Sequence, residues 1–157
     1  MRRLMDLIAG DARDILLAVG TDDVAGLDDR TRFGAHLALG GGLDPTWLDL
    51  FSEAARTATG QSDPMDFLDA RLEMDGAGSD DDALTIERVD PSWITAVARI
   101  SDQSVSSIAG RWIDLVEEEL GMLPREEKPW IRELAAQVVA FCRTADAARD
   151  VLFVWSL

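Results

Sequence analysis

The sequence has no tyrosine, one cysteine and one histidine, and these shortages exclude several kinds of site. With Cys142 alone, the chain cannot form an internal disulfide. With His36 alone, a zinc site built on two histidines is excluded, and a Ser-His-Asp triad would have to use that one residue. The G-x-S-x-G and H-E-x-x-H motifs of hydrolases and metalloproteases are also missing. We therefore predict no metal site and no cofactor.

Basic residues are scarce as well: 15 Lys and Arg stand against 30 Asp and Glu, for a net charge of -15. About half of that charge lies in residues 61–90, where ten acids and two bases give a net charge of -8. Proteins that bind a nucleic-acid backbone or an anionic membrane surface need clustered Lys and Arg, so we predict neither partner. A basic protein partner is compatible with this charge.

Long apolar runs are missing too, since no run approaches the roughly twenty residues that a membrane-spanning helix needs. The first four residues resemble the start of a signal peptide. However, charged residues interrupt the apolar stretch that should follow, at Asp6, Asp11, Arg13 and Asp14. We expect a cytoplasmic protein.

The clearest element present is a C-terminal helix, predicted over residues 129–148 and followed by a strand at 151–155. Apolar residues recur at helical spacing along it, at Trp130, Leu134, Val138, Phe141 and Ala145. The run that follows is β-branched and aromatic and is too short for another helix, which is typical of a buried strand. Cys142 falls within the apolar stripe, which favours a buried, unreactive thiol. We expect the rest of the chain to pack around this pair.

Other segments predict further helices and strands. Helices are expected over 3–19, over about 102–120, and after the Asp-Pro pairs at 44–45, 63–64 and 90–91, because aspartate caps a helix and proline is favoured at its first position. Strands are expected at 32–39 and, at a sheet edge, at 84–89. The sequence thus predicts one globular domain over 1–157, of mainly helical α+β class, with about six helices and a small two- or three-stranded sheet that includes the C-terminal strand. The alternative is an all-α bundle with an extended tail.

Two groups of acids are candidates for binding a partner. The first lies in residues 74–83, predicted as a mobile acidic loop whose aspartates do not fit the EF-hand register: with Asp75 at position 1, position 6 is Asp80 instead of glycine. The second is a glutamate run at the C-terminus of the predicted helix over 102–120, where carboxylates oppose the helix dipole. The predicted partner-binding residues are Asp75, Asp80, Asp81, Asp82, Glu117 and Glu118.

These features favour a binding protein over an enzyme, and three functions remain open. The first is an acidic intracellular module of immunity, antitoxin or accessory type that docks a basic protein, since bacterial immunity proteins and antitoxins are often small, acidic and poor in motifs. The second is a small-ligand-binding protein or enzyme with a pocket near His36, although the sequence names no nucleophile for that residue to activate. The third is a homo-oligomeric scaffold, in which Trp155 and Leu157 at a sheet edge pair with a second copy to form a homodimer.

Overall fold

The structure is a computed structural model that describes residues 5–21, 25–40, 43, 45–60, 65–73 and 84–156. The acidic loop predicted at 74–83, with Asp75, Asp80, Asp81 and Asp82, lies outside the described residues. The helix starts predicted at Asp44 and Asp63 lie outside them too.

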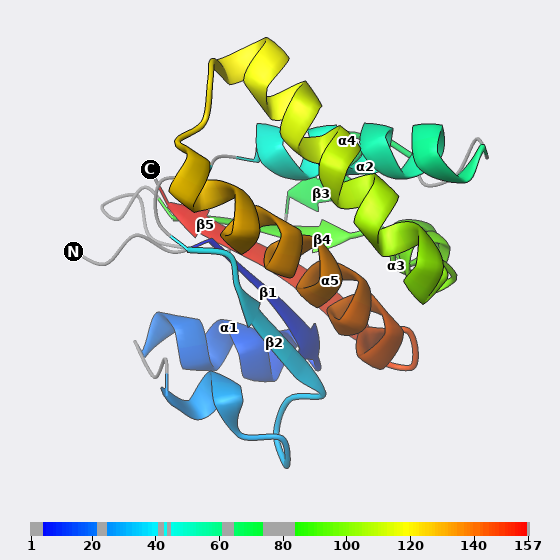
Figure 1. The fold of residues 1–157 in the computed structure, drawn as a ribbon. Helices are drawn as coiled ribbons and strands as arrows, with labels where there is room; N and C mark the ends of the chain where they lie inside the picture. The colour runs from blue at the N-terminus through cyan, green and yellow to red at the C-terminus, as the bar shows by residue number, and fades with distance from the viewer. Residues whose placement is uncertain are drawn as a thin grey trace.

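The described strands form one five-stranded antiparallel sheet in the order β2-β1-β5-β4-β3 (Figure 1). The strands are β1 Met5–Gly10, β2 Ala35–Ala38, β3 Arg71–Glu73, β4 Leu84–Val89 and β5 Asp150–Ser156. The C-terminal strand β5 is central: it pairs with β1 on one side and with β4 on the other. The sheet therefore joins the two ends of the chain, and its edges are β2 and β3.

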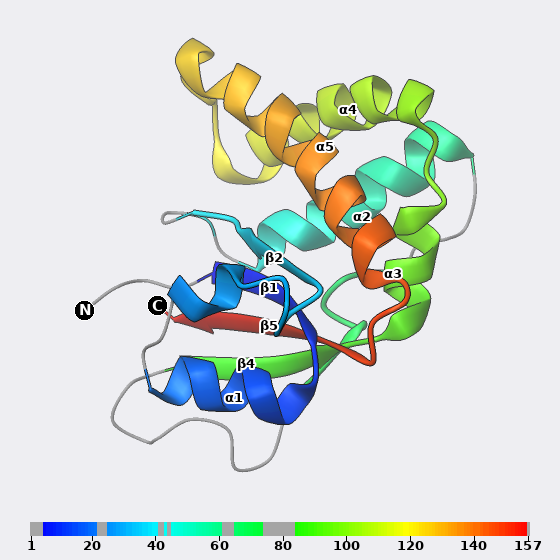
Figure 2. The ribbon, with the colours of Figure 1, turned by 90° about the horizontal axis from the view of Figure 1, so that it is seen from below.

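Helices cover both faces of the sheet, as Figure 2 shows in side view. One face carries a layer of four helices: α2 Thr46–Thr59, α3 Pro91–Ala98, α4 Asp102–Leu120 and α5 Lys128–Ala145. The other face carries α1 Ala12–Gly20 and the short 3₁₀ helix η1 Ala25–Asp28, and a second 3₁₀ helix, η2 Arg125–Glu127, precedes α5. The sheet is thus the middle of three layers.

The hydrophobic core has two parts, because helices cover both faces of the sheet. Along β5, Val151 and Phe153 pack with the four-helix layer, whereas Leu152 and Val154 pack with α1, and all four side chains are buried. A strand buried on both faces has a continuous apolar sequence, which is why the run at 151–155 could be recognised. The helix stripe before it and the burial of Cys142 are confirmed as well, except that Trp130, the first residue of the predicted stripe, is 39% exposed.

The predicted fold class is wrong in the size of the sheet, and the all-α alternative is wrong too. Five strands and, in the described ranges, five α-helices make a mixed α+β fold, where two or three strands and about six helices were expected. The helix predicted over 3–19 is a strand, β1, followed by the helix α1. Helices cover β1 on both faces, so its residues Met5, Leu7, Ile8 and Ala9 are all buried. The continuous apolar sequence of this strand was therefore mistaken for the apolar stripe of a helix.

Two strand positions are also corrected. The strand expected at a sheet edge, 84–89, is β4, which lies inside the sheet between β5 and β3. The predicted dimerisation through Trp155 required the C-terminal strand to lie at a sheet edge. That strand is instead the central strand of the sheet. It pairs with β1 over residues 150–155 and with β4 over residues 152–156, so it is not an edge strand.

Candidate functional site

The end of α4 is the best candidate for a functional surface. α4 ends at Gly121, whose φ of 99° lies in the left-handed region that favours glycine, and the chain then turns toward η2. At this turn Leu120 is 50% exposed and Met122 is 83% exposed. Large apolar side chains that a fold leaves this exposed and close together in the chain are typical of contact surfaces.

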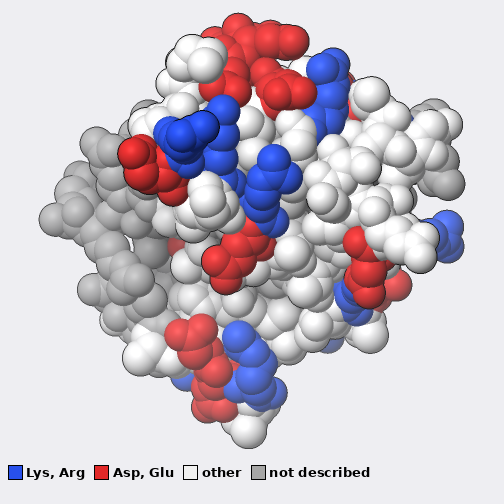
Figure 3. All heavy atoms as spheres, viewed as in Figure 1, with Lys and Arg blue, Asp and Glu red and all other residues white. Residues whose placement is uncertain are grey.

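Four exposed glutamates lie near these apolar side chains in the sequence, together with the exposed Arg125. Glu118 and Glu119 are exposed in the last turn of α4, which carries no basic residue, and Glu126 and Glu127 are exposed in η2. Figure 3 shows acidic side chains gathered at the upper end of the molecule, where α4 ends. Because the free carbonyls at a helix C-terminus already carry partial negative charge, Glu118 and Glu119 add to an unfavourable local potential, whereas Glu127 lies at the N-terminus of α5, where a carboxylate is favourable. We call Glu118, Glu119, Leu120, Met122, Glu126 and Glu127 the acidic tip.

The two predicted binding residues that the structure describes are placed differently. Glu118 is exposed at the acidic tip. Glu117 is turned inward: its Oε2 accepts a hydrogen bond from the backbone N–H of Leu123 at 3.1 Å, and its Oε1 lies 3.6 Å from Lys128 Nζ. Glu117 therefore holds the turn after α4 in place, while Glu118 faces solvent.

His36 lies on β2 between two carboxylates. Its Nε2 lies 2.6 Å from Asp6 Oδ2 on β1, its Nδ1 lies 2.8 Å from Asp28 Oδ1 in η1, and its side chain is 6% exposed. Burial disfavours the imidazolium ion, but the hydrogen bonds and charges of Asp6 and Asp28 outweigh burial and raise the pKa of His36. The hydrogen bond with His36 lowers the pKa of Asp28.

This arrangement ties η1 to the sheet and uses both ring nitrogens of His36. A general base needs a nitrogen that can reach a substrate proton, and here carboxylates occupy both positions. The geometry therefore favours a structural role for His36. We call Asp6, Asp28 and His36 the His36 cluster.

A second buried ionic group lies on the opposite face of the sheet, and the sequence analysis missed it. Arg71 on β3 is 7% exposed, and its Nη1 lies 3.0 Å from Glu87 Oε1 on β4. Glu87 Oε1 also accepts a hydrogen bond from Trp155 Nε1 at 2.6 Å. The guanidinium carbon lies 5.3 Å from the ring centre of Phe67 and 5.5 Å from that of Phe153. We call Arg71, Glu87 and Trp155 the Arg71 cluster.

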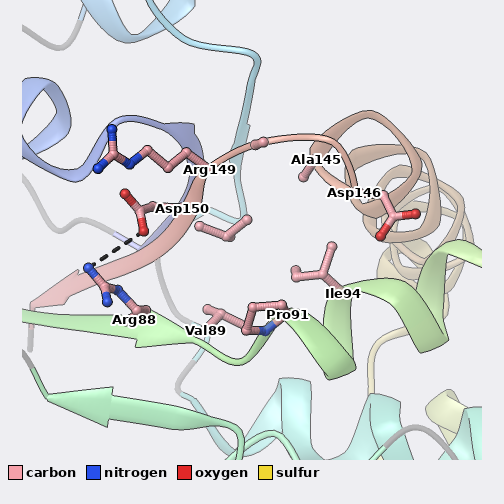
Figure 4. A pocket seen from close by; sticks show the side chains of 10 residues that line it. Arg88, Val89, Pro91, Ile94, Ala145, Asp146, Arg149 and Asp150 are labelled. Carbon is pink, nitrogen blue, oxygen red and sulfur yellow. Dashed lines mark ion pairs between the residues drawn. The ribbon is translucent and has the colours of Figure 1, made fainter.

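A hollow opens where β4 leads into α3 and α5 leads into β5 (Figure 4). Its volume of about 50 Å³ holds only a few water molecules, and Val89, Pro91, Ile94 and Ala145 line its apolar side. Arg88 and Asp150 point toward each other at its mouth, with Arg88 Nη2 3.5 Å from Asp150 Oδ1. The hollow is too small for a metabolite of ordinary size.

A wider polar cleft of about 590 Å³ adjoins the hollow at the start of α1. Two carboxylates already occupy the helix N-terminus there: Asp150 Oδ2 accepts from the N–H of Ala12, and Asp11 Oδ1 accepts from the N–H of Arg13. Arg149 pairs with Asp11 at 3.6 Å. Since the chain's own carboxylates take the place that a bound anion would use, this cleft is not an anion site.

Neither a metal site nor a family is indicated. Within the described ranges, no group of three or more His, Cys, Asp or Glu side chains could hold a metal ion, and no helix has both the length and the apolar character needed to cross a membrane. Comparison of the chain with protein-family models, with curated proteins and with solved structures found no match.

Proposed function

We propose that this protein is an acidic, cytoplasmic protein-binding module of immunity, antitoxin or accessory type, which docks a basic protein through the acidic tip. The observation that carries the proposal is the exposure of Leu120 and Met122 among four exposed glutamates. An apolar centre with a charged rim is the usual composition of a protein contact surface.

The two kinds of side chain supply different parts of the binding energy. Burying a side chain the size of Leu or Met contributes about 1.5–3 kcal/mol. Methionine is also flexible, so Met122 can adapt to the shape of a partner. Glu118 and Glu119 gain more from a basic partner than carboxylates elsewhere would, because that partner also relieves their repulsion from the C-terminus of α4.

The partner that fits this surface is a segment with apolar side chains flanked by Lys or Arg. Charge complementarity of this kind steers encounter and selects the partner, while the apolar contacts hold the complex. The contribution of the charges falls as salt is added, because exposed charges are screened beyond about 10 Å at 0.1 M salt.

The test is an affinity capture from native cytosol at low and high salt with matched variants. The double variant Leu120→Ser/Met122→Ser removes the apolar centre, and Glu118→Lys/Glu119→Lys reverses the nearest charges. Leu17→Ser is the matched control, because Leu17 on α1 is 63% exposed and lies outside the acidic tip. We expect a basic protein to be retained by the wild type and the control at low salt, and to be lost with both tip variants.

A fourth variant separates the two acidic segments. Asp80→Asn/Asp81→Asn/Asp82→Asn neutralises acids of the loop at 74–83, which is the other predicted binding segment. Loss of the partner in this variant, with full retention by the tip variants, would move the interface to that loop. Equal retention by every variant would contradict docking through either acidic segment.

A further inference from the structure

The outer edge of β2 has no neighbouring strand among the described residues. Leu39 N donates to Met5 O, and Leu37 lies opposite Leu7, so residues 35, 37 and 39 face β1 through their backbone groups. In an antiparallel ladder the alternate residues point the other way, so the N–H and C=O groups of His36 and Ala38 face outward. No strand among the described residues pairs with these groups.

Natural proteins protect such edges with charge, proline or a covering element. β2 carries no proline, and its one ionisable side chain, His36, is turned into the molecule between Asp6 and Asp28. Residues 34–39 read Gly-Ala-His-Leu-Ala-Leu, whereas the other edge strand, β3, is Arg-Leu-Glu. Exposed β2 is therefore the edge at which a further strand can be added.

A groove of about 290 Å³ runs beside this edge, between β2 and α5. Its α5 side carries Gln137, Ala140 and Thr144, which are small or uncharged. Glu133 and Trp130 continue the same face of the helix, since they precede Gln137 by four and seven residues. In Figure 3 the surface over the middle of α5 is mainly uncharged. A second backbone can approach closely here.

The two ends of the groove carry opposite features. Arg30 lines it at the start of β2. At the other end, just beyond β2, a Cβ atom on Gly40 would lie 3.7 Å from the exposed ring of Trp130, and Glu133 follows one turn later on α5. Arg30 also lies 3.9 Å from Asp28, and its side chain is 51% exposed. The basic end and the acidic, aromatic end of the groove are complementary to each other when two copies meet about a two-fold axis.

We propose that a second copy of this chain occupies the groove, with β2 paired antiparallel to β2 of the partner copy about a two-fold axis at Leu37. The two five-stranded sheets would then form one continuous sheet. In this register His36 of each copy lies opposite Ala38 of the other, and both residues have outward backbone groups. Ala35 lies opposite Leu39 of the other copy, and the two Leu37 side chains meet on the axis.

The same axis also brings the ends of the groove together. It sets Arg30 of each copy beside Glu133 and Trp130 of the other, which gives an ion pair and a cation–π contact twice. Such a two-fold contact is closed, so it produces a dimer and no fibre. The interface uses β2 and α5 and makes no use of the exposed apolar pair Leu120 and Met122, so it is independent of the proposed partner docking.

Sedimentation equilibrium of the full chain tests the dimer. Ala38→Lys places a charge on the edge at an exposed position, and Arg30→Glu and Glu133→Arg each place like charges together. We expect the wild type to dimerise and each of these variants to raise the dimer dissociation constant at least about tenfold. The double variant Arg30→Glu/Glu133→Arg restores the opposite charges, and we expect it to recover most of the affinity. Glu53→Arg, exposed on α2, is the control and should not change dimerisation.

Amide hydrogen exchange gives a readout at the edge itself. In the dimer the N–H groups of His36 and Ala38 exchange slowly, and dilution or Ala38→Lys makes the His36 N–H exchange quickly. A wild type that stays monomeric at every concentration would overturn the proposal. So would a dimer that the edge and charge variants leave unchanged, since it must use another surface. Circular dichroism shows whether each variant is folded.

Discussion

The His36 cluster and the Arg71 cluster bury charge on opposite faces of one sheet, and they do so in different ways. In the His36 cluster both ring nitrogens lie within hydrogen-bond distance of carboxylate oxygens. In the Arg71 cluster, Nε and Nη1 of the guanidinium make no hydrogen bond in the described structure, although Nη1 is close enough to Glu87 for an ion pair. The rings of Phe67 and Phe153 replace the missing hydrogen bonds.

The two clusters respond differently to the loss of a partner. Imidazole and carboxyl groups can give up their charge by moving a proton, so the His36 cluster can adjust to a change. An arginine cannot be deprotonated in a protein. Burial lowers the pKa of Arg71, although the negative charges of Glu87 and Asp49 act to raise it. The Arg71 cluster must therefore keep its counter-charge or lose stability.

Removing Glu87 gives the largest expected effect. Glu87→Leu leaves the buried Arg71 without its ion-pair partner and takes the acceptor from Trp155 Nε1. Breaking a buried ion pair by removing one partner costs about 3–5 kcal/mol of unfolding free energy. Urea denaturation followed by circular dichroism measures the loss.

A second substitution checks that the loss comes from the stranded charge. Arg71→Leu/Glu87→Leu replaces the pair with apolar side chains, and such replacements are often close to neutral, so we expect most of the stability to return. The control Glu53→Leu changes an exposed glutamate and should stay within about 0.5 kcal/mol of the wild type. A double variant as unstable as Glu87→Leu would show that packing, and not charge, sets the cost.

His36→Leu should cost less, although it also strands a buried charge. Asp6 keeps only the N–H of Met5 as a hydrogen-bond donor in the described structure. Because a carboxyl group can bind a proton, the cost is that of a buried polar group left without its partner, about 1–3 kcal/mol. The same urea denaturation measures it.

The two clusters are distinguished by which substitution lowers the unfolding free energy more. If His36→Leu destabilised the protein more than Glu87→Leu, the distinction between an adjustable and a fixed charge would be wrong. His36→Gln is the conservative variant: its amide can still donate to Asp6, so we expect a smaller loss than for His36→Leu.

The sequence predicted well where the signals are local. The apolar stripe of α5 and the continuous run of β5 each lie within one element, and both were recognised. The N-terminal segment failed because Leu4, Ile8, Ala12 and Ile15 follow helical spacing across a strand and a helix. Asp11, which caps α1, was the signal for the true helix start.

Long-range pairings could not be predicted. Asp6 and His36 are thirty residues apart, and Arg71 and Glu87 are sixteen apart; only the register of the strands brings each pair together. Of the acidic tip, the glutamates were visible in the sequence as a run at a helix end. The exposure of Leu120 and Met122 was not visible in the sequence, because a leucine in the last turn of an amphipathic helix is as easily buried as exposed.

The smallest expected effect concerns pH and Asp28, the exposed member of the His36 cluster. His36 is the single histidine of the chain, so its ring protons give an unambiguous titration by NMR. We expect a midpoint above the ordinary pKa of 6.5, because Asp6 and Asp28 stabilise the imidazolium ion. Asp28→Asn should move the midpoint down toward 6.5, and should change the unfolding free energy by less than about 1 kcal/mol, because Asp28 is 67% exposed and water screens its charge.

The raised pKa of His36 also sets the direction of a change in stability with pH. The folded protein binds the proton of His36 more tightly than the unfolded chain, so the cluster's contribution is fully present below pH 6.5 and is lost as pH rises through the raised folded pKa. Asp28→Asn should narrow the pH range over which this loss occurs, because it brings the folded pKa closer to the unfolded one. A His36 midpoint at or below 6.5, with stability independent of pH above it, would mean that burial outweighs the two carboxylates. The His36 cluster would then hold a neutral imidazole, and its contrast with the permanently charged Arg71 would be larger still.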